Sequence, residues 1–80
     1  ATITLTDKDL AAGIRRDRMA CPLCHAFARA LGGRWHIDGL VADDLDRQRS
    51  IVLPFDMRMW IANYDAGHKM VSKTFELGEG

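Results

Sequence analysis

Apolar and polar positions divide the chain into short segments, and most have the spacing of one kind of element. Alternation over residues 2–5 predicts a strand, because successive side chains of a strand point to opposite faces. Thr6, followed three positions later by Asp9, resembles a capping box and predicts that a helix begins there. The apolar face expected for this helix consists of Leu10, Ala11 and Ile14.

Two longer helices have clearer apolar stripes. The first is predicted to begin at Cys21-Pro22, because proline suits the first helical position, and to end at Gly32-Gly33. The second is predicted to begin at Pro54 and to close at residues 65–67. The residues expected to be buried at helical spacing are Leu23, Cys24, Phe27, Ala28 and Leu31 in the first helix, and Met57, Trp60, Ile61 and Tyr64 in the second.

Between these two helices the chain has the pattern of a small sheet. Residues 35–37 read as a strand before the turn dipeptide Asp38-Gly39. Two short apolar runs follow, at residues 40–42 and 51–53, and they predict a hairpin. Its polar tip at residues 43–50 is expected to be exposed.

The end of the chain completes the fold prediction. Residues 71–77 are expected to form a last strand, and residues 78–80 to be frayed. The order of elements predicts an α+β fold with a small sheet of three to five strands and two or three helices packed on one face. Residues 1–80 are expected to make a single domain, because a chain of this size holds one core.

The composition excludes several classes of protein. With 48 % hydrophobic and 28 % charged residues, the chain is too apolar to be disordered and too polar to be a membrane protein. We expect no secretory signal peptide at its start, and Ala1-Thr2 is typical of a start from which methionine was removed, although a cut precursor would have the same start. Two cysteines are too few for a disulfide framework, which favours a reducing compartment. We expect a location in the cytoplasm of a host cell.

Charge is balanced overall but uneven along the chain. The 11 basic and 11 acidic residues give a net charge of zero, without the basic excess of a nucleic-acid-binding protein. Residues 1–36 hold six basic and three acidic residues, whereas residues 37–80 hold five and eight. One interpretation is a mixed, solvated surface, and the other is two faces of opposite sign that steer a charged macromolecule. The candidate interaction residues are Arg15, Arg16 and Arg18, then Asp43, Asp44 and Asp46, with Trp35 as an exposed anchor on its strand.

One short motif, Cys21-Pro22-Leu23-Cys24-His25, has several chemical interpretations. It matches the attachment signature of c-type haem, in which two thioethers hold the macrocycle and the histidine binds iron. Zinc is a second interpretation, with Cys21, Cys24, His25 and His36 as ligands, although a second close pair of ligands is missing. A thiol redox pair is a third, since a helix N-terminus lowers a thiol pKa. The simplest interpretation is that Cys24 packs as a small hydrophobic residue, and we expect no bound metal or other cofactor.

No other pattern suggests chemistry. The cluster Asp43, Asp44 and Asp46 lacks the glycine and terminal glutamate of a calcium-binding EF-hand loop. There is no glycine-rich phosphate loop, and no nucleophile is spaced with a base as catalysis requires. We therefore expect that the protein is not an enzyme.

Several segments resemble a group of short proteins encoded by bacteriophages and prophages. They are Ile3-Thr4-Leu5-Thr6, Cys21-Pro22 with the helix over residues 26–31, Leu53-Pro54, Trp60-Ile61, Tyr64-Asp65-Ala66-Gly67 and Thr74-Phe75-Glu76-Leu77. The group has no assigned chemistry, so the resemblance supplies no catalytic residue. Cys24 and His25 depart from its pattern, which weakens the haem and zinc interpretations. The resemblance implies a protein that acts by binding, as anti-CRISPR and other anti-defence proteins do.

Three functions follow as hypotheses. The preferred one is a non-enzymatic accessory protein that binds and inhibits a host or defence macromolecular complex. The second is a small zinc or haem domain that uses the Cys21-x-x-Cys24-His25 motif. The third is a regulator that contacts nucleic acid through Arg15, Arg16 and Arg18.

Overall fold

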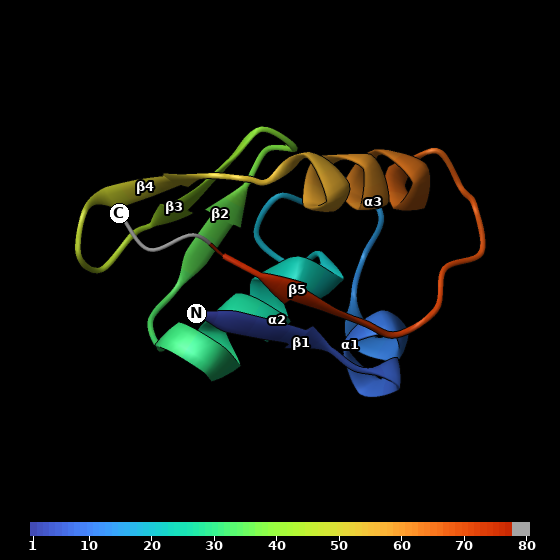
Figure 1. The fold of residues 1–80 in the computed structure, drawn as a ribbon, viewed down its shortest axis with the longest axis horizontal. Helices are drawn as coiled ribbons and strands as arrows, with labels where there is room; N and C mark the ends of the chain where they lie inside the picture. The colour runs from blue at the N-terminus through green and yellow to red at the C-terminus, as the bar shows by residue number, and fades with distance from the viewer. Residues whose placement is uncertain (78–80) are drawn as a thin grey trace.

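A computed structural model describes residues 1–77 as two small sheets and three helices around one core (Figure 1). The expectation for residues 78–80 lies outside the described residues. The elements in chain order are β1 (Thr2–Leu5), α1 (Asp7–Ala12), α2 (Pro22–Leu31), β2 (Trp35–Ile37), β3 (Val41–Asp44), β4 (Arg49–Val52), α3 (Phe55–Asp65) and β5 (Lys73–Glu76).

The first sheet joins the two ends of the described chain. Strand β1 pairs antiparallel with β5, and Ile3 lies opposite Phe75 in this register. Beyond the strands, the N–H of Leu77 donates to the carbonyl oxygen of Ala1 at 2.7 Å. Ile3, Leu5 and Phe75 are buried, whereas Thr2, Thr4 and Glu76 are exposed, so the alternation in the sequence defines the face that meets the core.

The second sheet has the order β2-β3-β4, with both pairs antiparallel. In the register, Trp35 lies opposite Asp44, and Asp44 lies opposite Arg49. Its inner face includes Trp35, Ile37 and Ala42, all buried. Figure 1 shows this sheet at one end of the molecule, away from α1.

Local sequence signals explain where the helices begin. Thr6 caps α1 with a complete capping box: its hydroxyl accepts from the N–H of Asp9, whose carboxylate accepts from the N–H of Thr6. Helix α2 begins at Pro22, with Cys21 as the N-cap residue, and α3 follows Pro54. Asp9 also receives two hydrogen bonds from Arg29, at 2.9 and 2.6 Å, which attach α1 to α2.

One cluster of buried residues fills the space between the sheets and helices. Helix α2 contributes Leu23 and Phe27, and α3 contributes Met57 and Trp60. The predicted stripe of α3 is confirmed in full, because all four of its residues are buried. In α2, Ala28 and Leu31 are only partly buried and Ala26 is added to the stripe.

The predicted fold class is confirmed, since the structure is a small α+β fold with five strands and three helices. The strands are divided between two sheets, a detail that the sequence pattern did not reveal. The first helix is shorter than expected: it ends at Ala12, so Ile14 lies outside it and is exposed. Within residues 1–77, no helix has the length and apolar character needed to cross a membrane.

Candidate functional site

Residues 14–20 form a closed loop between α1 and α2, which we call the arginine loop. The N–H of Ile14 donates to the carbonyl oxygen of Ala20 at 2.9 Å and joins the two ends of the loop. Inside it, the carboxylate of Asp17 accepts from the N–H groups of Met19 and Ala20 at 2.9 and 3.1 Å. The loop therefore has a defined shape without belonging to a helix or strand.

Two arginines fix this loop to the C-terminal end of α3. The Nε of Arg15 donates to the carbonyl oxygen of Tyr64 at 2.9 Å, and its guanidinium lies 4.9 Å from the centre of the Tyr64 ring. Arg16 uses its backbone N–H for the Asp65 carboxylate and its Nε for the Asp65 carbonyl oxygen. Its φ of 61° lies in the left-handed region, where non-glycine residues are uncommon. The contacts with α3 therefore offset the cost of the unfavourable backbone angle at Arg16.

The outer side of the loop combines apolar and basic side chains. Ile14 is 55 % exposed and Met19 is 50 % exposed. Arg18 is exposed, and its guanidinium makes none of the hydrogen bonds found among residues 1–77. Backbone N–H groups of Val41 and Leu40 hold the pKa of Asp38 below its usual value, and the charge of Arg18 lowers it further. The prediction that Ile14 lies on a buried helical face is wrong, and Met19 was not among the predicted interaction residues. The available signal in the sequence was Asp17, because aspartate favours an Asx turn in a loop.

Asp44 lies at the centre of a second charged region, residues 43–49, which we call the acidic hairpin. The predicted exposure of residues 43–50 is confirmed for residues 45–50 and is wrong for Asp44, which is 1 % exposed. The turn itself spans only residues 45–48. Its Oδ2 accepts from Nη1 of Arg47 at 3.0 Å and from Nε of Arg49 at 3.2 Å, and its Oδ1 accepts two backbone N–H groups. Burial opposes ionisation of this carboxyl, but these donors outweigh it and hold the pKa of Asp44 at about 2.

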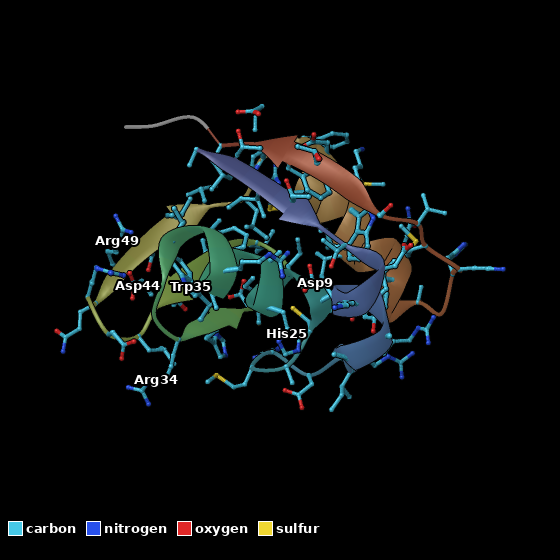
Figure 2. The ribbon with its side chains drawn as sticks, turned by 90° about the horizontal axis from the view of Figure 1, so that it is seen from below. Asp9, His25, Arg34, Trp35, Asp44 and Arg49 are labelled. Carbon is cyan, nitrogen blue, oxygen red and sulfur yellow. The ribbon has the colours of Figure 1, made fainter. Side chains whose placement is uncertain are left out.

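The other two acidic residues of the hairpin also have partners within the chain, like Asp44, which Figure 2 shows beside Arg49. Asp46 accepts from the Nε and the backbone N–H of Arg34, at 3.0 and 2.9 Å. Asp43 accepts from the hydroxyl of Ser50 and lies 3.5 Å from Nδ1 of His36. The three aspartates therefore hold the hairpin together, and the charges of Asp44 and Asp46 are paired with neighbouring arginines.

The expectation that Trp35 exposes one face is wrong. Its side chain is 2 % exposed and its ring centre lies 5.0 Å from that of Phe27. The indole N–H donates to the carbonyl oxygen of Gly32 at 2.8 Å. Trp35 is buried because α2 covers the inner face of this strand, so it joins the hairpin to the core.

The cysteine motif lies where α2 begins. The two sulfur atoms, of Cys21 and Cys24, are 3.3 Å apart, both side chains are buried, and both thiols are free. His25 is exposed and His36 lies in β2. Among residues 1–77, no three histidine, cysteine, aspartate or glutamate side chains are grouped to hold a metal ion. The four predicted zinc ligands are therefore not brought together in this structure.

Comparisons of the chain with protein-family models, with curated proteins and with solved structures find no match.

Proposed function

We propose that this protein acts by binding, with the arginine loop as its contact surface, and that it inhibits a host or defence complex of proteins. The observation that carries the proposal is the combination of a fixed loop shape with the exposed side chains of Ile14, Arg18 and Met19. The bacteriophage character comes from the sequence resemblance alone. The proposal assigns no catalytic residue.

The composition of the loop suits a protein interface. Methionine and arginine are enriched at the centre of such interfaces, and an apolar residue beside a charged one supplies both burial and orientation. Because hydrogen bonds already fix the loop, binding would cost little of the conformational entropy that ordering a free loop requires. Arg15 and Arg16 maintain the loop through α3, which leaves Arg18 as the arginine offered to a partner.

The chemistry of the loop favours an acidic protein surface as the partner. The first 36 residues carry an excess of three positive charges, whereas the compensating acidic residues lie later in the chain. A positive surface steers the protein toward a negative one and raises the association rate at low salt. Inhibition would then follow from covering a surface that the partner complex needs.

The test compares a loop variant with a matched control. The loop variant carries Ile14→Ser, Met19→Ser and Arg18→Glu, and the control carries Val71→Ser and Lys73→Glu, which also change exposed apolar and basic residues. Both are used as bait in a lysate of the source host, and the affinity of each protein captured by the parent is then measured by calorimetry. We expect the loop variant to lose at least about 100-fold in affinity, equivalent to about 2.7 kcal/mol, and the control to bind like the parent.

Equal binding by the loop variant and the parent would contradict the proposal, provided that circular dichroism shows both to be folded. Nucleic acid is the alternative occupant of the same loop. It is favoured only by the presence of three arginines, two of which donate to carbonyl oxygens of the protein itself. Binding of the parent to duplex DNA, with an affinity that falls steeply with salt and is lost in the loop variant, would replace the protein partner by nucleic acid.

A further inference from the structure

Cys21 and Cys24 are placed as a reactive pair. Cys21 is the N-cap of α2 and Pro22 is its first residue, so Cys24 follows on the first turn, and its N–H donates to the carbonyl oxygen of Cys21 at 3.0 Å. This turn brings the two sulfur atoms to 3.3 Å. The spacing and the helix N-terminus are those of dithiols that interconvert with a disulfide.

The surroundings make one proton of the pair easier to lose. The thiol of Cys21 donates to the sulfur of Cys24, which holds the pKa of Cys24 below its usual value and raises the pKa of Cys21. While Cys24 is protonated, its thiol donates to the carbonyl oxygen of Arg18 at 3.1 Å. Cys24 therefore loses its proton more readily than Cys21, and its sulfur is placed to accept the proton of the Cys21 thiol.

A cavity of about 210 Å³ lies directly beside Cys21. Its walls carry both signs of charge, from Arg16 and Arg18 on the arginine loop and from Asp17, Asp38 and Asp65. Arg16, Arg18 and Asp38 are exposed, so these walls reach solvent. The guanidinium groups of these walls suit a carboxylate and their carboxylates suit an ammonium group, so the cavity fits a small molecule that carries both.

We propose that Cys21 and Cys24 form a thiol–disulfide exchange site for small zwitterionic disulfides of the cystine and glutathione disulfide class, which enter through this cavity. The cavity shares Arg18 with the arginine loop, but the exchange reaction goes beyond the proposed binding function and is tested without the partner.

The exchange takes place in two steps. Cys24, once it has lost its proton, accepts the proton of Cys21 across the 3.3 Å contact as the sulfur of Cys21 attacks one sulfur of the small disulfide. The S–S bond of the small disulfide breaks, and the released thiolate takes up the proton that Cys24 first lost. Cys24 then attacks the sulfur of Cys21, forms the internal disulfide and releases the second small thiol with the proton of Cys24. The protein loses two electrons and two protons, and the small disulfide gains them.

The first experiment uses the unmodified, reduced protein. It is incubated with glutathione disulfide under native conditions, quenched with acid and weighed by mass spectrometry. We expect the mass to fall by two hydrogen atoms, and excess reduced glutathione to reverse the change. A folded protein that keeps both thiols would overturn the proposal. So would a rate that drops when sucrose stabilises the fold, because reaction would then require global unfolding.

Variants separate the two roles. Cys24→Ser should accumulate a mixed disulfide with glutathione on Cys21, because the resolving thiol is missing. Cys21→Ser should react at least about tenfold more slowly, because Cys24 lies behind Cys21 and does not line the cavity. Equal rates for the two variants would contradict the assignment of Cys21 as the thiol that attacks the small disulfide.

The charge of the cavity has its own test. Arg18→Gln should slow the reaction with glutathione disulfide about tenfold and leave the reaction with uncharged bis(2-hydroxyethyl) disulfide unchanged. Lys8→Gln is the matched control, because it removes the same charge from an exposed residue that does not line the cavity. If both variants react with glutathione disulfide like the parent, the cavity does not select the substrate.

Discussion

The acidic hairpin and the arginine loop have similar densities of charge in the sequence but different structures. In the hairpin, all three aspartates have partners within the protein: Asp44 is buried between two arginines, Asp46 pairs with Arg34, and Asp43 lies beside His36. In the loop, Arg15 and Arg16 contact α3, whereas Arg18 and the apolar Ile14 and Met19 face solvent. A run of like charges therefore does not by itself mark a contact surface, because its charges can be used to maintain the fold.

The difference predicts that changes in the hairpin reduce stability and that changes on the outer side of the loop reduce binding. The largest effect is expected for Trp35→Ala, which removes a buried ring that packs on Phe27 and lies opposite Asp44 in the sheet. We expect a loss of about 3–5 kcal/mol, enough to unfold much of so small a domain. Thermal denaturation followed by circular dichroism measures it, with Met19→Ala as the exposed control. A cooperative transition unchanged by Trp35→Ala would show that the hairpin is not attached through this ring.

The next effect is a dependence on pH centred on Asp44. Its pKa of about 2 in the folded protein lies below the ordinary value of 3.8, so the ionised carboxylate stabilises the fold. This stabilisation is complete above pH 3.8 and is lost as the pH falls through about 2. Asp44→Asn should therefore lower the Tm most at neutral pH and little at pH 2. Parallel curves of Tm against pH for the variant and the parent would contradict the assignment.

A smaller effect, confined to binding, is expected for Arg18→Glu. Because the Arg18 guanidinium makes no hydrogen bond within the described residues, reversing its charge should leave the Tm within about 2 °C of the parent. The affinity for the partner should fall by about 1.4 kcal/mol or more, a tenfold change. Asp46→Lys is the comparison in the hairpin and should leave affinity unchanged. The opposite result would move the contact surface to the hairpin.

The smallest effect is expected for Arg34→Gln. Arg34 and Asp46 form an ion pair at 3.0 Å, but both side chains are largely open to water. Exposed pairs of this kind contribute about 0.2–1 kcal/mol. We expect a loss near the lower end of that range, measured by urea denaturation, and a smaller loss in 1 M salt. A loss of stability as large as that of Trp35→Ala would mean that all the hydrogen bonds and ion pairs of the hairpin depend on this one pair.

The sequence was sufficient to predict the elements, because their signals are local. The capping box at Thr6, the proline before α3 and the spacing of Met57, Trp60, Ile61 and Tyr64 all operate within a few residues. Trp35 and Asp44 were misjudged because their burial depends on the packing of α2 against the sheet, which periodicity over a three-residue or four-residue strand does not record.

The candidate site at the arginine loop also depends on contacts between distant segments, which local sequence patterns do not record. Ile14 was predicted to lie on the face of a helix, and the sequence gives no sign that Tyr64 and Asp65, 49 positions away, would hold Arg15 and Arg16. The closeness of Cys21 and Cys24 was implied by their spacing, since residues three apart on a helix are neighbours. The cavity beside Cys21 was not, because residues from the loop, β2 and α3 build it together.

The pairing of β1 with β5 has a consequence for how the chain reaches its structure. Hydrogen-bonded partners in this sheet are separated by almost the whole sequence, as in the contact between Thr2 and Glu76. Contacts between such distant residues form slowly, because the intervening chain loses conformational entropy before the contacts begin to stabilise the fold. During synthesis, Ile3 and Leu5 must therefore remain without their strand partners until the last strand has left the ribosome. The hairpin of β3 and β4, which closes over a four-residue turn, can form well before then.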